Sequence, residues 1–507
     1  MDTDTYSAMF CRQCQETAGN TGCTRTGVCG KNRETAGLMD ALVARLEDLA
    51  IERKPSKDLG RFVARALFMT LTNANFDDVR IGSALLEAEQ RLGRDGTRTL
   101  PYAFTEVNPD LRSLKELVLF GLKGIAAYAH HAAMFGREDG SVYAFILRAL
   151  REMGERRTVA ELTRLVIDCG STAVKAMALL DAANTTACGD PEVTTVSRAV
   201  GTRPGILVTG HDLRDLGELL EQTRGQGIDV YTHGEMLPAH AYPELRKYPH
   251  LKGHYGGAWH RQQKEFAAFN GAILVTTNCL TPVAAAYRDR IFTTGVAGYP
   301  GVPHIADRQQ GGKKDFSAVI ARARSCPPPE PLDPAGPLVC GFARNQLLGL
   351  VDRIVAAVKS GRIKRFVVMA GCDGRHATRE YYTKFAAALP QDTVILTAGC
   401  AKYRYLDVVK GEIDGIPRVI DAGQCNDAYA LARLALALKD AFGLKDVNDL
   451  PLEFNLAWYE QKAVAVILAL FALGFRNIRL GPTVPAFLSP GVAKALVERF
   501  GIRGIDD

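Results

Sequence analysis

The sequence predicts a multidomain α and α/β protein, with a helical bundle at its N-terminal end followed by two α/β domains with parallel sheets. Two observations predict this fold class. Up to about residue 200, apolar residues recur at spacings near three and four, as in helices that bury one face. From Pro204 onward, short apolar runs alternate with helix-like stretches, which is typical of βαβ units.

The length of the chain requires more than one domain, because 507 residues exceed what a single ordinary core can hold. We expect a helical domain over residues 1–200 and α/β domains over 201–338 and 339–507. Residues 325–337 are rich in proline and are expected to form a linker or surface loop before the second α/β domain.

Helices are expected first, with breaks at glycine and proline between them. Their ranges are 34–53, 58–71, 78–93, 111–135 and 157–183. Strand-like runs follow at 205–210, 228–231, 272–278, 366–371, 394–399 and 419–424. The last segment is expected to hold a long helix from about 453 to 474, a strand near 477–480 and a closing helix.

Composition and charge exclude several classes of function. A formal charge of +6, spread along the chain, gives no case for binding nucleic acid or an acidic membrane surface. The first residues are polar and lack the apolar core of a signal peptide, and the longest apolar stretch, 463–474, is too short to span a bilayer. We therefore expect a cytoplasmic protein whose twelve cysteines are thiols or metal ligands, not disulfides.

Four of the apolar runs stop on a cysteine, and these residues are Cys279, Cys372, Cys400 and Cys425. The residue just past the carboxyl end of a parallel strand faces the crevice in which α/β proteins bind ligands. A lone cysteine there is more often a small buried apolar residue. Four such cysteines together favour one shared metal site and a metalloenzyme. Cys169, Cys188, Cys326 and Cys340 lack this placement and are taken as structural.

Oxygen and nitrogen donors occupy comparable positions. His211 and Glu235 each follow a strand-like run, and Glu460 and Lys462 precede the apolar part of a helix. Alone, each has an ordinary explanation: a core histidine, an acid that begins a helix, or a lysine that orients Glu460. Together with the thiolates, they predict a metal site with mixed donors. Thiolates bind soft iron–sulfur units, whereas carboxylate and imidazole suit harder, more open iron. Its oxygen- and nitrogen-rich edge would bind a small substrate.

A separate cysteine motif lies near the start of the chain. Cys11, Cys14, Cys23 and Cys29 form the pattern C-x2-C-x8-C-x5-C. Four thiolates within such a short segment suit an iron–sulfur cluster or structural zinc, and the spacing favours iron–sulfur because it differs from the usual zinc spacings. A cluster so close to the chain's start could lie at the surface and receive electrons.

Together these residues resemble the hybrid-cluster protein family, also called prismane proteins or hydroxylamine reductases. The segments that carry the resemblance are CRQCQET at 11–17, LTNANFD at 71–77, TGHDL at 209–213, THGEMLPAHAYPEL at 232–245, TTNC at 276–279, MAGCDGR at 369–375, LTAGCAKYRY at 396–405, GQCNDAY at 423–429 and YEQKA at 459–463. Between Cys29 and His211 the chain looks shorter than in full-length members.

The resemblance implies two clusters and a fold of Rossmann-like α/β domains similar to carbon monoxide dehydrogenase. The N-terminal cysteines Cys11, Cys14, Cys23 and Cys29 would bind a [4Fe-4S] cluster. A hybrid [4Fe-2O-2S] cluster, with a persulfide on Cys372, would be bound by His211, Glu235, Cys279, Cys372, Cys400, Cys425 and Glu460.

The implied activity is reduction of hydroxylamine to ammonia and water, with Glu460, Lys462 and Cys372 as the catalytic residues. Reduction of nitric oxide at the same site is one alternative. A non-catalytic redox or nitrosylation-transferring protein that uses Cys372 is another. A nickel-containing activity fits less well, because oxygen ligands replace part of the sulfur set. No convincing Gly-rich dinucleotide motif is present, so a separate electron-donor protein is expected beside the small nitrogen-oxide substrate.

Overall fold

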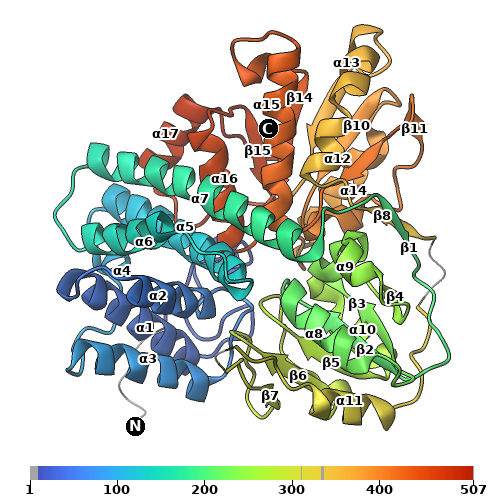
Figure 1. Ribbon diagram of the computed structural model, residues 1–507. Coiled ribbons are helices and arrows are strands. Elements are labelled where there is room, and N and C mark those ends of the chain that lie inside the picture. Colours follow the sequence, from blue (N-terminus) through green and yellow to red (C-terminus); the bar gives the residue numbers. More distant parts are fainter. Residues whose placement is uncertain (1–8, 310, 333–335, 506–507) are drawn as a thin grey trace.

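The computed structural model describes residues 9–309, 311–332 and 336–505. Helices come first, and two parallel sheets with their own helices follow; Figure 1 shows the helices on the left and the two sheets one above the other on the right. The helices of the first part are α1 (Arg33–Glu52), α2 (Lys57–Met69), α3 (Asp78–Leu92), α4 (Tyr102–Thr105), α5 (Pro109–Met134), α6 (Gly140–Met153) and α7 (Val159–Cys188).

The starts of these helices are encoded locally by N-cap side chains that accept hydrogen bonds from otherwise unpaired backbone N–H groups. Asn32 caps α1 and Ser56 caps α2, each accepting from the N–H three residues ahead. Thr158 and Glu161 form a reciprocal capping box at the start of α7. The expected helix starts at 34, 58, 78, 111 and 157 lie within two residues of the starts of α1, α2, α3, α5 and α7.

The first sheet is entirely parallel, with strand order β4-β3-β2-β5-β6-β7. Its strands are β2 (Gly205–Thr209), β3 (Asp229–Thr232), β4 (Leu251–His254), β5 (Ala272–Val275), β6 (Ile291–Thr294) and β7 (His304–Ile305). The helices between and after them are α8 (Leu213–Thr223), α9 (Pro243–Arg246), α10 (Gln262–Phe269) and α11 (Ser317–Arg324). The chain runs outward from β2 in one direction and then from β5 in the other. This reversal creates a ligand-binding crevice at the carboxyl ends of β2 and β5.

The second sheet is also parallel, with order β13-β10-β9-β14-β15, and it reverses direction between β9 and β14. Its strands are β9 (Arg365–Val368), β10 (Thr393–Thr397), β13 (Val419–Asp421), β14 (Leu452–Ala457) and β15 (Ile478–Gly481). Its helices are α12 (Arg344–Gly349), α13 (Val351–Lys359), α14 (Glu380–Ala388), α15 (Ala428–Ala441), α16 (Gln461–Ala472) and α17 (Pro490–Phe500). Two short antiparallel pairs complete the sheets: β1 (Thr194–Val196) with β8 (Leu338–Cys340), and β11 (Glu412–Ile413) with β12 (Ile416–Pro417).

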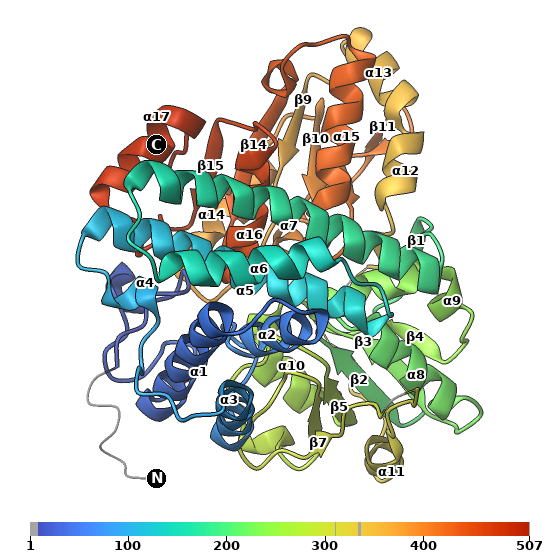
Figure 2. The same cartoon turned by 60° about the vertical axis from the view of Figure 1, so that its left-hand side comes forward.

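Helix α16 joins the helical part to the second sheet. It packs against α5 and α7, and one hydrophobic core includes residues of all three helices and of the second sheet. The contact with α7 is so close that a Cβ on Gly170 would lie 2.0 Å from the backbone oxygen of Leu468. Figure 2 shows α7 lying across the front of this junction. The start of α16 is thereby fixed where the helices meet the strand ends.

The predicted fold class is confirmed: helices precede two parallel α/β sheets. The expected helix from about 453 is wrong at its start, because residues 452–457 form β14, a strand that pairs in parallel with β9 and β15. Helix α6 was not predicted, although its apolar residues have helical spacing.

The domain boundaries at 200 and 338 stay predictions. Within the described residues, no helix is both long and apolar enough to cross a bilayer.

We expect Gly170→Ala to destabilise the protein by about 1–3 kcal/mol, because the new methyl group must push α7 away from α16. Gly82→Ala is the matched control: Gly82 lies inside α3 with open space around its Cβ position, so alanine should stabilise the helix by about 0.5–1 kcal/mol. Thermal unfolding of both variants checks this. Equal melting temperatures would contradict the close α7–α16 packing.

Candidate metal centre

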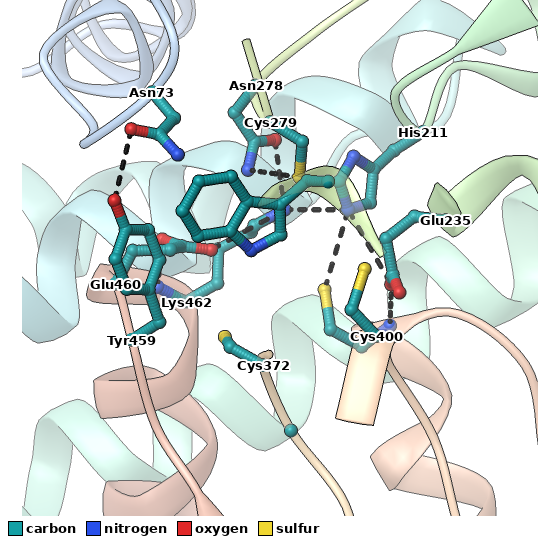
Figure 3. A pocket seen from close by; sticks show the side chains of 13 residues that line it. Asn73, His211, Glu235, Asn278, Cys279, Cys372, Cys400, Tyr459, Glu460 and Lys462 are labelled. Carbon is teal, nitrogen blue, oxygen red and sulfur yellow. Dashed lines mark hydrogen bonds and ion pairs between the residues drawn. The ribbon is translucent and has the colours of Figure 1, made fainter. Parts of the chain in front are cut away.

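The carboxyl ends of the two sheets face one small cavity of about 20 Å³. Its lining comprises Asn73, His211, Glu235, Trp259, Asn278, Cys279, Gly371, Cys372, Cys400, Cys425, Tyr459, Glu460 and Lys462. The set includes every residue predicted for the second site. Three of the donors follow β2, β3 and β5 of the first sheet, and four follow β9, β10, β13 and β14 of the second. Figure 3 shows their side chains directed toward one space.

Glycine makes the turns that aim the cysteines of the second sheet. Gly371, Gly399 and Gly423 follow the strands β9, β10 and β13 and have φ of 114°, 86° and 132°. Side chains rarely adopt such angles, and a Cβ on Gly371 would lie 2.0 Å from the Ala457 backbone oxygen. An Ala-Gly pair precedes each of Cys372, Cys400 and Cys425. At each pair the chain turns back across the end of its strand.

The hydrogen bonds of His211 fix its tautomer. Lys462 can only donate, and its Nζ lies 2.9 Å from His211 Nε2, so Nε2 accepts. The ring proton is then on Nδ1, which lies 3.1 Å from Thr277 Oγ1. A histidine held in this way presents a lone pair at Nε2, the form in which imidazole binds metals. Burial and the neighbouring Lys462 lower the pKa of His211 well below its ordinary value, which keeps the ring neutral.

Glu235 is held beside His211 with one oxygen unused. Its Oε2 accepts from the Cys425 backbone N–H at 2.9 Å, while Oε1 is buried and has no partner among the described residues. Gln424 donates to the backbone oxygens of both His211 and Glu235, at 3.2 and 3.0 Å. One donor atom each of His211, Glu235 and Cys425 lie within 4.8 Å of one another, the kind of arrangement that binds a cation.

The cavity gathers acids and thiols around a single cationic side chain. Burial raises the pKa of Cys425 to about 12, and it raises the pKa values of Cys279, Cys372 and Cys400 as well. Burial alone would lower the pKa of Lys462, but the thiols and carboxylates around it raise that pKa above its ordinary value. Metal ions would displace the thiol protons and satisfy the unused oxygen. The donor set therefore fits a group containing iron, sulfur and oxygen.

The N-terminal cysteines form a second constellation. Cys11 and Cys23 pair through two backbone hydrogen bonds of 3.0 and 2.8 Å, and Cys11 and Cys29 are half-buried. Ligands of one zinc ion would lie about 3.8 Å apart, given Zn–S bonds of about 2.3 Å. Yet within the described ranges no three of these cysteine sulfurs lie within 4.8 Å of one another.

Backbone and side-chain hydrogen bonds connect the two constellations directly. The Gln15 N–H donates to the Tyr459 backbone oxygen at 2.9 Å, one residue from Glu460. Arg379, which is fully buried, donates to the Gln15 side chain at 2.7 Å and to the backbone oxygens of Trp458 and Cys372 at 2.7 and 3.1 Å. The ring of Tyr459 packs on Trp259 with centroids 4.5 Å apart.

A larger cavity of about 640 Å³ lies on the other side of His211, between the helical part and the first sheet. The His131 ring in its wall packs edge-on against the His211 ring, with centroids 5.8 Å apart, and Thr277 also lines it. Arg65 and Asp307, on its exposed side, pair at 2.6 Å. Only the His211 side chain therefore separates the wall of this larger cavity from the small cavity at the sheet ends.

Comparisons with known proteins agree with this geometry. The model of the Prismane/CO dehydrogenase family matches residues 9–506. The chain belongs to this family. The prismane resemblance is therefore confirmed, and the chain is an iron–sulfur redox enzyme.

Curated relatives of this prismane-family chain match it over almost their whole length. Proteins named hydroxylamine reductase from Nitratidesulfovibrio vulgaris and Parabacteroides distasonis are each 54% identical to it, and each alignment covers 98% of both proteins. The one from Desulfovibrio desulfuricans is 53% identical and covers 98% of this chain and 97% of the relative.

Solved structures share the fold at low identity. Carbon monoxide dehydrogenase IV from Carboxydothermus hydrogenoformans has a TM-score of 0.59 at 14% identity, covering 97% of this chain and 90% of that one. A nickel-free carbon monoxide dehydrogenase from Thermococcus sp. AM4 has a TM-score of 0.57 at 18% identity, covering 97% and 88%. These neighbours confirm the predicted likeness of the fold to carbon monoxide dehydrogenase.

Sequence reasoning missed several residues of the prismane-family site. Asn73, Trp259, Asn278 and Tyr459 line the cavity, and the buried Tyr128 hydroxyl lies 3.7 Å from Cys425 Sγ. Three of them lie in segments already singled out, LTNANFD, TTNC and YEQKA. Asn278 and Tyr459 directly precede the candidate ligands Cys279 and Glu460, so proximity in the sequence was the available signal for these two. Trp259 and Tyr128 carry no local signal, because only tertiary packing brings them to the site.

We expect Arg379→Met to destabilise the prismane-family chain by on the order of 3 kcal/mol, because it leaves buried backbone oxygens of Cys372 and Trp458 without a donor. It should also loosen the cysteine loop at Gln15 and lower the iron content. Thermal unfolding and iron analysis check this, with the exposed Arg353→Met as the control. A variant as stable and as iron-rich as the control would contradict a linking role for Arg379.

Proposed function

We propose that the protein is a hydroxylamine reductase, which converts hydroxylamine, two electrons and two protons into ammonia and water. The observation that carries the proposal is the convergence of four thiols, two carboxyl groups, one imidazole and one ammonium group on a single cavity. Relatives with that name at 51–54% identity support the same reaction.

We further propose the cofactors that these residues hold. Cys11, Cys14, Cys23 and Cys29 would hold a [4Fe-4S] cluster. The hybrid [4Fe-2O-2S] cluster, with a persulfide on Cys372, would be held by His211, Glu235, Cys279, Cys372, Cys400, Cys425 and Glu460. When bound, these groups supply electrons singly and an open metal position for the substrate.

Lys462 is the proposed proton donor. Its Nζ holds a proton in a fully buried setting, 3.0 Å from Asn278 Oδ1 and 3.7 Å from Glu460 Oε1. A proton placed at the oxygen that leaves nitrogen turns a poor leaving group into water. Glu460 accepts the Lys462 backbone N–H at 2.8 Å as the N-cap of α16, so the two side chains are positioned together.

Chain residues also connect the substrate site with the electron entry site. The hydrogen bond from Gln15 to Tyr459 joins the cysteine loop to the residue before Glu460. Electrons would come from a separate donor protein and enter at the cysteine loop, whose Cys11 and Cys29 are half-buried. Small substrates could approach from the larger cavity beside His211. A cytoplasmic setting suits such thiol-rich sites, which oxidise readily.

Replacing Lys462 tests the mechanism. We expect Lys462→Met to lower the rate of hydroxylamine reduction about 100-fold or more, because general-acid catalysis contributes at least about that factor. Iron content and visible absorption should stay unchanged, since Lys462 is not a proposed ligand. The exposed Lys494→Met is the control.

Two outcomes would contradict the proposal. A Lys462→Met enzyme with full activity would remove Lys462 from the mechanism. Consumption of nitric oxide by the unmodified enzyme, much faster and at lower concentration than that of hydroxylamine, would contradict hydroxylamine as the substrate.

A further inference from the structure

The surface around the N-terminal cysteine loop exposes apolar side chains beside half-buried cysteines. Phe10 and Val28 are 47% and 43% exposed, and they adjoin Cys11 and Cys29. Phe10 is held in place by the Arg12 and Arg112 guanidinium groups, each 5.8 Å from its ring centroid. Exposed apolar residues of this kind, surrounded by charges, are typical of transient protein interfaces.

The charges around these residues are mainly positive. Arg12 and Arg112 share one buried acid, Glu116, at 2.7 and 3.6 Å. Arg375 pairs with Glu16, whose side chain is only 4% exposed, at 2.7 Å, and also donates to the Val28 backbone oxygen at 2.9 Å. The two acids are buried, whereas the three arginine side chains remain 21–39% exposed.

Arg25 adds a positive charge that is not paired with an acid among the described residues. It is exposed in the loop between Cys23 and Cys29 and forms no ion pair with any residue that the structure describes. A cluster in this loop would carry negative charge, but buried cations already lie beneath it: Lys123 donates to the Gln13 side chain at 2.8 Å, and Lys31 lies over the Phe76 ring. Arg25 faces solvent, where it can act on an approaching protein.

We propose that the rim formed by Phe10, Arg12, Arg25, Val28, Arg112 and Arg375 is the docking surface for a small acidic electron-transfer protein. This inference rests on the proposed function, because it names the partner that supplies electrons at the cysteine loop. The four arginines face only two carboxylates, both buried, so an acidic partner gains favourable charge pairing at encounter. Val28 and Phe10 supply the apolar contact that brings the redox groups together.

Binding of a reduced plant-type [2Fe-2S] ferredoxin, a small acidic carrier, tests the surface. Calorimetry at low ionic strength should show binding to the unmodified iron-loaded protein that weakens as salt is added. Arg25→Glu should weaken it about five- to tenfold, and Val28→Glu should weaken it similarly by placing a carboxylate beside Arg375. Lys252→Glu is the matched control. Lys252 is exposed on β4, the edge strand of the first sheet, and is not one of the rim residues.

Turnover separates this inference from the proposed function. Arg25→Glu should lower the ferredoxin-driven rate by the same factor and leave the rate with reduced methyl viologen within about twofold of the unmodified enzyme. If Arg25→Glu and Val28→Glu bind ferredoxin as Lys252→Glu does, the docking surface is overturned. If the unmodified protein fails to reduce hydroxylamine with methyl viologen, the proposed function fails, while the binding measurement still decides the docking surface.

Discussion

The structure depends on one electrostatic constraint: four thiols and two carboxyl groups share a buried cavity in which Lys462 is the only lysine or arginine among the described lining residues. Burial raises the pKa of the thiols and of Glu460, so the protein alone disfavours their charged forms. Cations that bind thiolate and carboxylate together resolve this conflict. The cavity is therefore best understood as a metal-binding site: the fold supplies the ligands, and a metal cluster would complete it.

The fold meets this constraint by placing the crevices of two parallel sheets against each other. Each crevice lies where strand order reverses, so each sheet contributes donors from neighbouring strand ends. Helix α16 then fixes Glu460 and Lys462 at the junction, since its apolar surface is buried against α5 and α7. The cysteine loop attaches to the same junction through Gln15 and Arg379, which ties the site of electron entry to the cavity.

Features of the fold that depend on short-range sequence patterns could be predicted from the sequence. Apolar residues at helical spacing, alternating elements and apolar runs that end in cysteine are short-range patterns, and from them the fold class and the order of the elements followed. The residues expected at the second site all line one cavity, although their role as ligands stays a prediction. Residues 453–457 were misread as helix because the long apolar run after them dominated the pattern. Trp259, Tyr128 and Arg379 could not be found, since their roles arise only from contacts between distant segments.

Metal analysis of anaerobically purified protein tests the central claim most directly. Two four-iron clusters predict about eight iron atoms per chain, with neither nickel nor zinc. About four iron atoms, bound at the N-terminal cysteines alone, would leave the cavity without its proposed cluster. Stoichiometric nickel or zinc would likewise contradict the account, because the mixed donor set would then serve a different metal.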